Sequence, residues 1–356
     1  MPQIDMAKLE GYLSEKLGAR NLSITAFSKN LEGWSMETFS LGLSYEKDGR
    51  EVKRNIIIRK EPVAGLLEPY DVSIEYRVLT ALKNTGIAIP ETYWHESDPS
   101  IMGLPFYVME KVEGIVHFFS TSTMFDPNWK LIPNEKERLS LAEEFVNNIA
   151  LIHNVDWSAK GLEFLGDPGP GKGSALRQVA YWRDVISRAG FGKKPSIAYA
   201  LNWLMDNPPE CDRVCLLHGD YRTGNYIAQD GHIKAVLDWE MVHLGDPMED
   251  ISYVIASVWR SRKPDSWISH LLPEKDFFAM YEAKSGIKID REKIKFYHVF
   301  NNFKAVGIPA TAANAFRSKP NLDLKVGVFG MMIYAAIFGL VQSLNKYVSA
   351  LPGQGV

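Results

Sequence analysis

The chain has 356 residues, with 46% hydrophobic and 23% charged side chains and a formal net charge of −3 at pH 7. This length allows one large domain or two lobes with their own cores, and the composition is that of an ordinary globular protein. The small net charge excludes a global field that would attract nucleic acid or anionic lipid, so we expect neither as a partner.

The first 110 residues carry alternating helix and strand patterns. In chain order, the spacing of apolar residues predicts a helix over residues 5–16, strands over 38–45 and 51–59, a helix over 72–83 and a strand over 105–114. Asp48 and Gly49 separate the first two strands and favour a hairpin. The sequence therefore predicts a small, sheet-rich N-terminal lobe that covers residues 1–110.

Beyond Gly114 helical patterns dominate. Asn134, with Glu137 three residues later, resembles a helix start, and that helix should run to about His153. Residues 166–173 (GDPGPGKG) form a loop by composition, and further helices are predicted over 181–189 and 198–207. Residues 111–356 are therefore expected to form a larger, mainly helical lobe.

The two cysteines, Cys211 and Cys215, are too few for a disulfide scaffold. Together with an N-terminus that lacks the pattern of a secretory signal, they favour a reducing, cytoplasmic setting. A zinc cluster with His218 is an alternative, but the usual Cys-x-x-Cys spacing and a second ligand pair are missing from the sequence. We interpret both side chains as buried thiols.

The segment LLHGDYRTGNYIAQDGHIKAVLDWE, residues 216–240, predicts a second hairpin. If Asp230 and Gly231 form a two-residue turn, Gln229 pairs with His232, and paired residue numbers add up to 461. Asp238 then lies opposite Thr223, and a slip of one residue would change this little. The hairpin therefore places Asp238 beside the loop that precedes its first strand.

That loop carries Asp220 and Asn225, so two carboxylates and an amide meet at one end of the hairpin. A hard cation such as Mg²⁺ prefers one or two carboxylates with substrate phosphates and water, and an Asn carbonyl is a suitable further ligand. The remaining Asp can orient a substrate hydroxyl or accept its proton, which is the arrangement of phosphoryl transfer. The alternative is a set of turn-capping residues, which is common for any one of them.

The motifs HGDYRTGN, LDWE and GDPMED resemble those of the aminoglycoside phosphotransferase and choline-kinase-like family, over about residues 20–260. The resemblance implies an α+β, bilobal protein-kinase-like fold with a small antiparallel sheet in the N-lobe. It implies that Asp220 is the catalytic base or orients the acceptor, and that Asn225 and Asp238 hold Mg²⁺. Of the neighbouring residues, His218 would support the loop and Asp246 would buttress it.

Arg222 occupies the place of a phosphate-facing Lys in protein kinases, so a phosphate contact and a solvent-facing loop position are both open. The resemblance also aligns Arg59 (IIIRKEP) with the basic residue of strand three and Glu75 (IEYRVLTAL) with the helix glutamate that anchors it. Lys60 is the second choice, because neighbours on a strand point to opposite faces and only one can serve. A solvated charge at a strand end is the other interpretation of Arg59.

The same resemblance assigns the remaining nucleotide contacts. Gly33 and Ser35 match the family's Gly-x-Ser nucleotide loop. An extended backbone from Met109 to Lys111 would bind the adenine edge, and an ordinary edge strand is the alternative for that segment. His153 lies on a helix that family members carry ahead of the catalytic loop, and we expect it to be packed rather than catalytic.

These observations predict an ATP- and Mg²⁺-dependent phosphotransferase that moves the γ-phosphoryl group to a hydroxyl of a small molecule. A nucleotide-binding pseudokinase scaffold and a metal-dependent phosphohydrolase are the alternatives. Family members phosphorylate aminoglycosides, choline, sugars, amino acids and hydroxyacyl thioesters. No acidic cluster suited to a polycationic drug stands out in the sequence of the helical lobe, so we favour a metabolic acceptor.

The last apolar segment, residues 326–345 (VGVFGMMIYAAIFGLVQSLN), carries no charge. Its length is near the lower limit for a membrane-spanning helix, but it contains Gln342, Ser343 and Asn345. We interpret it as a packed C-terminal core helix and expect no membrane partner, with a membrane span as the alternative.

Overall fold

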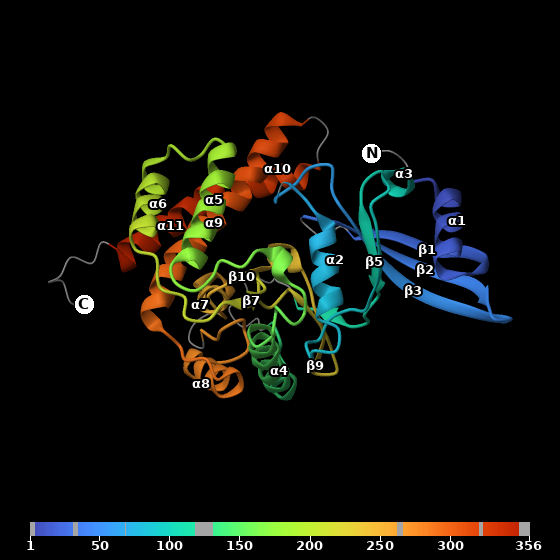
Figure 1. The fold of residues 1–356 in the computed structure, drawn as a ribbon, viewed down its shortest axis with the longest axis horizontal. Coiled ribbons are helices and arrows are strands. Elements are labelled where there is room, and N and C mark those ends of the chain that lie inside the picture. Colours follow the sequence, from blue (N-terminus) through green and yellow to red (C-terminus); the bar gives the residue numbers. More distant parts are fainter. Residues whose placement is uncertain are drawn as a thin grey trace. The chain divides into compact units, whose positions relative to one another are not determined.

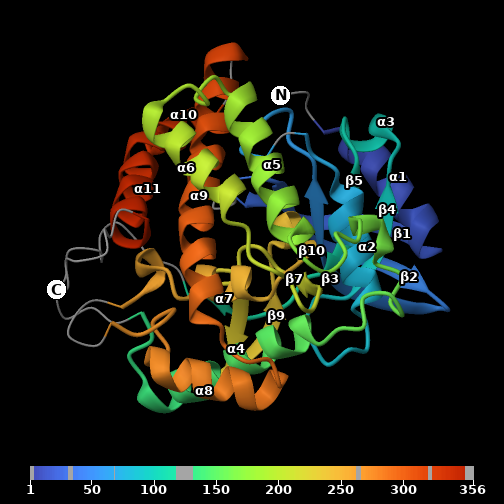
Figure 2. The ribbon, with the colours of Figure 1, turned by 60° about the vertical axis from the view of Figure 1, so that its left-hand side comes forward.

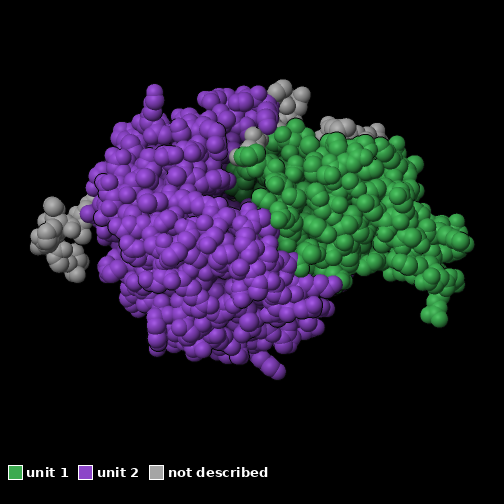
Figure 3. Space-filling model, viewed as in Figure 1, with its two compact units in different colours: residues 1–80, 90–112 green, residues 81–89, 113–356 purple. Residues whose placement is uncertain are grey.

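The described residues form two structural units, which are coloured separately in Figure 3. The structure is a computed structural model that describes residues 4–30, 35–67, 69–117, 131–261, 266–319 and 323–348. The first unit comprises residues 1–80 and 90–112, and the second comprises residues 81–89 and 113–356, in each case as far as they are described.

The first unit is built on an antiparallel sheet with the strand order β1-β2-β3-β5-β4 (Figure 1). In chain order its elements are α1 (Met6–Leu17), β1 (Arg20–Asn30), β2 (Glu37–Lys47), β3 (Arg50–Lys60), α2 (Val72–Ala81), β4 (Thr92–Glu96), α3 (Pro99–Met102) and β5 (Phe106–Glu110). The predicted α+β class with a small antiparallel sheet is therefore confirmed.

Local chemistry explains where these elements begin and turn. Asp5 caps α1 by accepting a hydrogen bond from the Lys8 N–H at 3.1 Å. Asp48 and Gly49 both have positive φ, +50° and +73°, and form the two-residue turn that joins β2 to β3. Both features confirm the sequence pattern. Strand β1, which the pattern missed, lies at the edge of the sheet next to β2 and buries few side chains, so its apolar periodicity is weak.

The core of the first unit lies between α1 and the sheet. Leu9 and Leu13 of α1 belong to one buried cluster with Leu41, Ile56 and Val108 of the central strands. Each of these side chains is fully buried. Burial of a Leu or Ile side chain stabilises a fold by about 1.5–3 kcal/mol, so this cluster fixes β3, the strand that ends in Arg59 and Lys60.

The second unit is mainly helical. Its elements are β6 (Ile115–Val116), α4 (Glu135–His153), α5 (Gly173–Arg188), α6 (Pro195–Asp206), β7 (Cys215–Leu217), β8 (Tyr226–Gln229), β9 (His232–Val236), β10 (His243–Gly245), α7 (Met248–Val254), α8 (Glu274–Ser285), α9 (Arg291–Ser318), α10 (Leu324–Met331) and α11 (Ile333–Tyr347). The predicted start of α4 is confirmed, because the Asn134 side chain accepts from the Glu137 N–H at 3.0 Å.

Residues 81–89 belong to the second unit, although the sequence had assigned them to the N-terminal lobe. The Ala88 N–H donates to the Asn148 side chain of α4 at 2.9 Å, and the Val236 N–H of β9 donates to the Ala88 carbonyl at 2.8 Å. These hydrogen bonds tie the segment to α4 and β9. The sequence pattern does not predict these hydrogen bonds, because each joins residues that are far apart in the chain.

Helix α9 is the central scaffold of the second unit. It packs against α5, α6, α7, α10 and α11, and Figure 2 shows it running through this group. Its buried side chains include Phe300, Phe303 and Val306. The sequence offered no motif for this part of the chain, yet the helix touches the site described below.

The C-terminal apolar segment differs from its prediction. It is broken at Met332 into α10 and α11, and only one face of the pair is buried. Gly327 and Gly330 let α10 approach Phe316 and Ala313 of α9 closely. The other face exposes Leu324, Val328, Met331, Met332, Tyr334 and Phe338. The interpretation as a packed core helix is therefore wrong for this exposed face.

Taken across the break at Met332, residues Leu324–Tyr347 are long and apolar enough to cross a membrane, by length and composition alone and among the described residues. Within the most apolar window of this stretch, 22% is buried.

Two histidines of the second unit make its stability depend on pH. Burial lowers the pKa of His270 and of His298 to about 4 from the ordinary 6.5. Between these values the unfolded chain binds protons that the folded chain does not, so the free energy of unfolding falls as the pH drops below 6.5. We expect a loss on the order of 1 kcal/mol for each histidine between about pH 7 and pH 5.

Urea unfolding of the wild type and of the double variant His270→Gln/His298→Gln at both pH values measures this loss. The double variant should lose less stability than the wild type on acidification. Equal losses in the two proteins would contradict the assignment.

Candidate active site

The hairpin of β8 and β9 has the predicted turn and a shifted register. Asp230 and Gly231 have φ of +53° and +76°, and Gln229 pairs with His232 as predicted. A bulge then changes the pairing to Ile227 with Ala235. The expected sum of 461 therefore holds as far as the pair of Ala228 with Ile233 and is wrong beyond the bulge, where extrapolation of the pairing places residue 238 opposite Gly224 instead of Thr223. The grouping of polar residues at this end of the hairpin is unaffected.

The loop of residues 218–225, between β7 and β8, surrounds the Asp220 carboxylate with donors. Oδ1 of Asp220 accepts from the Tyr253 hydroxyl at 2.5 Å and from Arg222 Nε at 3.1 Å. Oδ2 accepts from Asn225 Nδ2 at 2.7 Å. Burial raises the pKa of Asp220, but Arg222 and these hydrogen bonds outweigh it and hold the pKa below its ordinary value. Asp220 is therefore a carboxylate at neutral pH.

The hydrogen bonds that its amide group donates fix the orientation of the Asn225 side chain. Nδ2 donates both to the backbone carbonyl of Asp220 at 2.9 Å and to its carboxylate at 2.7 Å. The amide orientation follows from these partners, because only the NH₂ group can donate. The side-chain carbonyl oxygen of Asn225, Oδ1, therefore points away from Asp220 and is available as a ligand.

Asp238 is held beside Asn225 through its chain neighbour. The Leu237 N–H donates to the backbone carbonyl of Asn225 at 2.8 Å, and His218 Nε2 contacts the backbone carbonyl of Leu237 at 2.8 Å. Asp238 itself has left-handed backbone angles, φ 61° and ψ 58°. Such a conformation is uncommon outside glycine but is enriched for Asp and Asn, and the hydrogen bonds of Leu237 help to fix it.

The oxygen atoms of this group suit a hard divalent cation. Asp238 supplies a carboxylate and Asn225 a carbonyl, and Mg²⁺ prefers such ligands when phosphates and water complete the shell. In contrast, burial raises the pKa of Cys211 to about 11 and that of Cys215 to about 12. Both cysteines are therefore free, buried thiols that stay protonated at neutral pH, as predicted.

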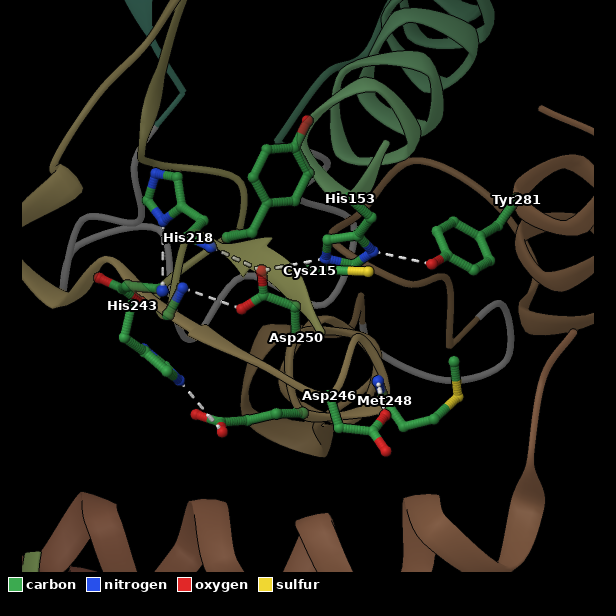
Figure 4. A network of polar contacts seen from close by, with 12 residues as sticks. His153, Cys215, His218, His243, Asp246, Met248, Asp250 and Tyr281 are labelled. Atoms are coloured by element: carbon green, nitrogen blue, oxygen red, sulfur yellow. Dashed lines mark hydrogen bonds and ion pairs between the residues drawn. The ribbon is translucent and has the colours of Figure 1, made fainter. Parts of the chain in front are cut away.

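Asp250 of α7 anchors the backbone of this loop (Figure 4). Its carboxylate accepts the backbone N–H groups of His218 at 2.8 Å and Gly219 at 2.9 Å. His153 lies between Asp250, at 3.3 Å, and the Tyr281 hydroxyl, at 2.7 Å. Although burial raises the pKa of Asp250, the hydrogen bond with His153 helps to hold it well below its ordinary value. A buried, charged acceptor thus fixes the backbone that precedes Asp220.

The anchoring role had been assigned to Asp246, and that prediction is wrong. Asp246 accepts from the Met248 N–H at 2.9 Å and pairs with Lys293 at 3.3 Å, away from the loop backbone (Figure 4). Both aspartates belong to the GDPMED motif, so spacing alone could not separate a helix cap from a loop anchor. His153 is a buried, hydrogen-bonded helix residue, as predicted.

Arg222 is not a solvent-facing loop residue. Its side chain is largely buried, its guanidinium lies 4.5 Å from the ring centre of Trp259, and its Nη1 donates to the Thr223 carbonyl at 3.2 Å. Burial lowers the pKa of Arg222, but the adjacent Asp220 carboxylate raises it further, so the group stays charged. The solvent-facing alternative is therefore wrong.

In the first unit, Arg59 and Glu75 form a buried ion pair. Arg59 Nε lies 3.1 Å from Glu75 Oε2, and both side chains are almost fully buried. A solvated strand-end charge is therefore wrong for Arg59. Lys60 instead pairs with Glu37, which also binds Lys29. Burial raises the pKa of Glu37, but its two lysine partners bring the pKa below its ordinary value.

The other residues expected near a nucleotide also belong to the first unit. Ser35 lies just before β2, and Gly33 lies outside the described residues. Met109 is buried in β5, whose neighbours in the sheet are β3 and β4, so the edge-strand alternative is wrong. Lys111 is the first residue beyond β5.

The structure thus brings the predicted residues together in two groups. Asp220, Arg222, Asn225 and Asp238 meet in the second unit, and Arg59 meets Glu75 in the first. Sequence reasoning missed Tyr253, although it lies three residues after Asp250 in the helix that follows GDPMED. No signal in the sequence separates this tyrosine from any other.

Comparisons with known proteins agree with this geometry. A model of the phosphotransferase enzyme family matches residues 48–274. The chain is 30% identical to acyl-CoA dehydrogenase family member 10 of Mus musculus over 84% of its own length, and it spans 27% of that relative.

Two solved structures share the fold. A protein of Ralstonia eutropha JMP134 named for the aminoglycoside phosphotransferases has 24% identity and a TM-score of 0.69, with 97% of this chain and 99% of that chain covered. A thermostable mutant of aminoglycoside phosphotransferase APH(4)-Ia, in ternary complex with AMP-PNP and hygromycin B, has 17% identity and a TM-score of 0.54, with 94% and 98% covered. The predicted protein-kinase-like, bilobal fold class is confirmed by these matches.

Proposed function

The chain belongs to the phosphotransferase enzyme family, and on that premise we propose that it transfers the γ-phosphoryl group of ATP to a hydroxyl of a small molecule, with Mg²⁺ as the metal. The observation that carries this proposal is the ionised Asp220 carboxylate beside the oriented amide of Asn225, with Asp238 held next to it. A structural neighbour binds AMP-PNP, which supports ATP as the donor.

Asp220 would act on the acceptor hydroxyl. Among the described residues, Oδ1 accepts two hydrogen bonds and Oδ2 one, from Asn225, so Oδ2 has a lone pair left for a substrate O–H. The lowered pKa of Asp220 makes it a weak base. The carboxylate therefore orients the hydroxyl first and takes its proton late, when the bond to phosphorus has begun to form.

Asn225 and Asp238 would hold Mg²⁺ through the carbonyl and carboxylate oxygens. When bound, the ion neutralises charge that develops on the transferred phosphoryl group. Arg222 stays next to Asp220 and keeps the carboxylate ionised while the acceptor approaches. Its buried stacking on Trp259 fixes that position, so we place Arg222 with the acceptor side of the reaction.

Arg59, anchored by Glu75, would bind the phosphates of ATP. The charge-neutral double variant Arg59→Met/Glu75→Gln removes the cation without leaving a buried carboxylate unpaired. We expect it to lower kcat/KM for ATP by about a hundredfold, whereas Lys60→Met should change kcat/KM little. Steady-state kinetics with MgATP decides between the two basic residues. A large loss in Lys60→Met with none in the double variant would reverse their assignment.

Names of relatives guide the choice of acceptor. The relative from Mus musculus is named an acyl-CoA dehydrogenase, so a hydroxyl on an acyl thioester is the first metabolic acceptor to test. The structural neighbour in complex with hygromycin B makes an aminoglycoside the second. We propose the thioester class, because the charged Arg222 lies beside Asp220, where the acceptor hydroxyl would bind, and repels a polycationic drug.

The experiment supplies γ-labelled MgATP to separate pools of hydroxyacyl thioesters, amino-sugars, choline-like alcohols and sugars. Labelled product in the thioester pool supports the proposed acceptor class. Faster labelling of amino-sugars than of any metabolite would replace it with a drug-modifying activity.

A further inference from the structure

A buried lysine on α9 contacts the loop that carries Asp220. Lys304 is 2% exposed, and its ammonium donates to the Gly219 carbonyl at 2.6 Å. The same ammonium lies 3.8 Å from the Glu249 carboxylate and 5.2 Å from the ring centre of Tyr253. These partners belong to the loop of residues 218–225 and to α7, so Lys304 links α9 to both.

A lysine at this buried position is energetically costly, because its charge is removed from water. A buried ammonium loses several kcal/mol of hydration, and it is tolerated only where a counter-charge and hydrogen bonds replace the water. Glu249, which also contacts His243 at 3.3 Å, supplies the charge. An apolar side chain of similar volume would generally stabilise such a position as well or better. Fold stability alone therefore does not explain a lysine at this place.

The peptide groups next to Asp220 are held from two sides. The Gly219 N–H donates to the Asp250 carboxylate at 2.9 Å, and the Gly219 carbonyl accepts from Lys304. Gly219 has φ of +82°, and a Cβ at this position would meet the Met241 carbonyl oxygen at 2.4 Å. An anion therefore binds the N–H and a cation binds the carbonyl of one glycine, and Asp220 is the next residue.

A second route leads from Lys304 to Asp220 through Tyr253. The lysine lies over the tyrosine ring, and the hydroxyl of that ring donates to Asp220 Oδ1 at 2.5 Å. A cation over an aromatic ring contributes about 0.5–2 kcal/mol, more when both are away from water. Lys304 thus constrains both the backbone and the carboxylate of Asp220.

We propose that Lys304 is a positioning residue for Asp220: it fixes the Gly219 carbonyl directly and the Asp220 carboxylate through Tyr253. The proposal rests on the proposed phosphoryl transfer, since it assigns Lys304 a place in aligning the acceptor hydroxyl. Loss of this lysine should impair transfer to the acceptor more than it impairs nucleotide binding. It should also loosen the loop in the absence of any substrate.

The central variant is Lys304→Met/Glu249→Gln, which removes both buried charges together and so leaves neither unpaired. Tyr253→Phe, which deletes one hydroxyl, tests the second route and serves if the double variant does not fold. Lys293→Met/Asp246→Asn is the matched control: Lys293 lies on the same helix and pairs with the buried Asp246, and among the described residues neither side chain hydrogen-bonds to the loop backbone.

Kinetics and hydrogen exchange are measured on all four proteins. We expect phosphoryl transfer by the double variant to fall by about a hundredfold and that by Tyr253→Phe by about tenfold, with the KM for MgATP within about threefold of the wild type. The ratio of ATP hydrolysis to transfer should rise in both. Amide exchange in residues 216–226 should accelerate without substrate, while Lys293→Met/Asp246→Asn should match the wild type in all these properties.

The outcomes separate the two proposals. Folded Lys304 and Tyr253 variants with wild-type transfer, coupling ratio and loop exchange would overturn the role of Lys304. If the wild type phosphorylates no acceptor, the proposed function fails. Faster loop exchange in the Lys304 variant would then still support its hold on Gly219, and unchanged exchange would overturn that as well.

Discussion

Replacement of Asp220 by Asn is expected to lower the rate of phosphoryl transfer by about a thousandfold. Asn has nearly the same shape as Asp, so the neighbouring Tyr253 and Arg222 can stay in place. It has lost the negative charge that orients and finally deprotonates the acceptor hydroxyl. In our proposal Asp220 acts on the acceptor, while Asn225, Asp238 and Arg59 bind the metal and the phosphates, so the dissociation constant for MgATP should change little.

Asp212→Asn is the control for this variant, since Asp212 is an exposed aspartate whose side chain pairs only with Lys293 among the described residues. Single-turnover transfer and nucleotide titration are measured on both variants. Wild-type transfer by Asp220→Asn would remove this carboxylate from the mechanism. Weak ATP binding in the same variant would show that its main effect lies in the nucleotide site.

The second large effect is expected at Asp238. Asp238→Asn should lower transfer at moderate Mg²⁺ by at least about a hundredfold and raise the Mg²⁺ concentration needed for half-maximal rate. The change removes a charge from the proposed metal site but keeps a residue that accepts the left-handed backbone found there. The expected loss therefore reflects the metal and not the fold.

Asp230→Asn is a matched control, because Asp230 lies in the turn of the same hairpin and also has positive φ, +53°. Transfer is measured as a function of Mg²⁺ for the two variants. The account requires the curve of Asp238→Asn to move to higher Mg²⁺ and that of Asp230→Asn to coincide with the wild type. If the Mg²⁺ dependence of Asp238→Asn coincided with that of Asp230→Asn, Asp238 would not be a ligand of the metal.

The residues that sequence reasoning found are those linked by local structure. A two-residue turn at Asp230 and Gly231 brings Asp238 back to the Asp220 loop, whatever the rest of the chain does. In the same way, β3, which ends in Arg59 and Lys60, and α2, which carries Glu75, are consecutive elements. The bulge between Ile227 and Ala228 changed the register but left these neighbours together.

The residues that it missed act over long separations. Lys304 reaches Gly219 across 85 positions of sequence, and nothing in its own helix distinguishes it from an exposed lysine. The choice between Asp246 and Asp250 depended on which of them faces the loop backbone, which spacing does not encode. The C-terminal segment was misjudged because its composition reports apolarity but not which face finds a partner.

The phosphate balance in a complete reaction tests the central claim most directly. γ-Labelled MgATP is incubated with the thioester and other hydroxyl pools, and label is counted in ATP, free phosphate and organic product, for the wild type and Asp220→Asn. Our account predicts that label lost from ATP appears mainly in an organic phosphate, and only with the wild type. Label that appears as free phosphate at the same rate with and without the pools would contradict it and identify a phosphohydrolase instead.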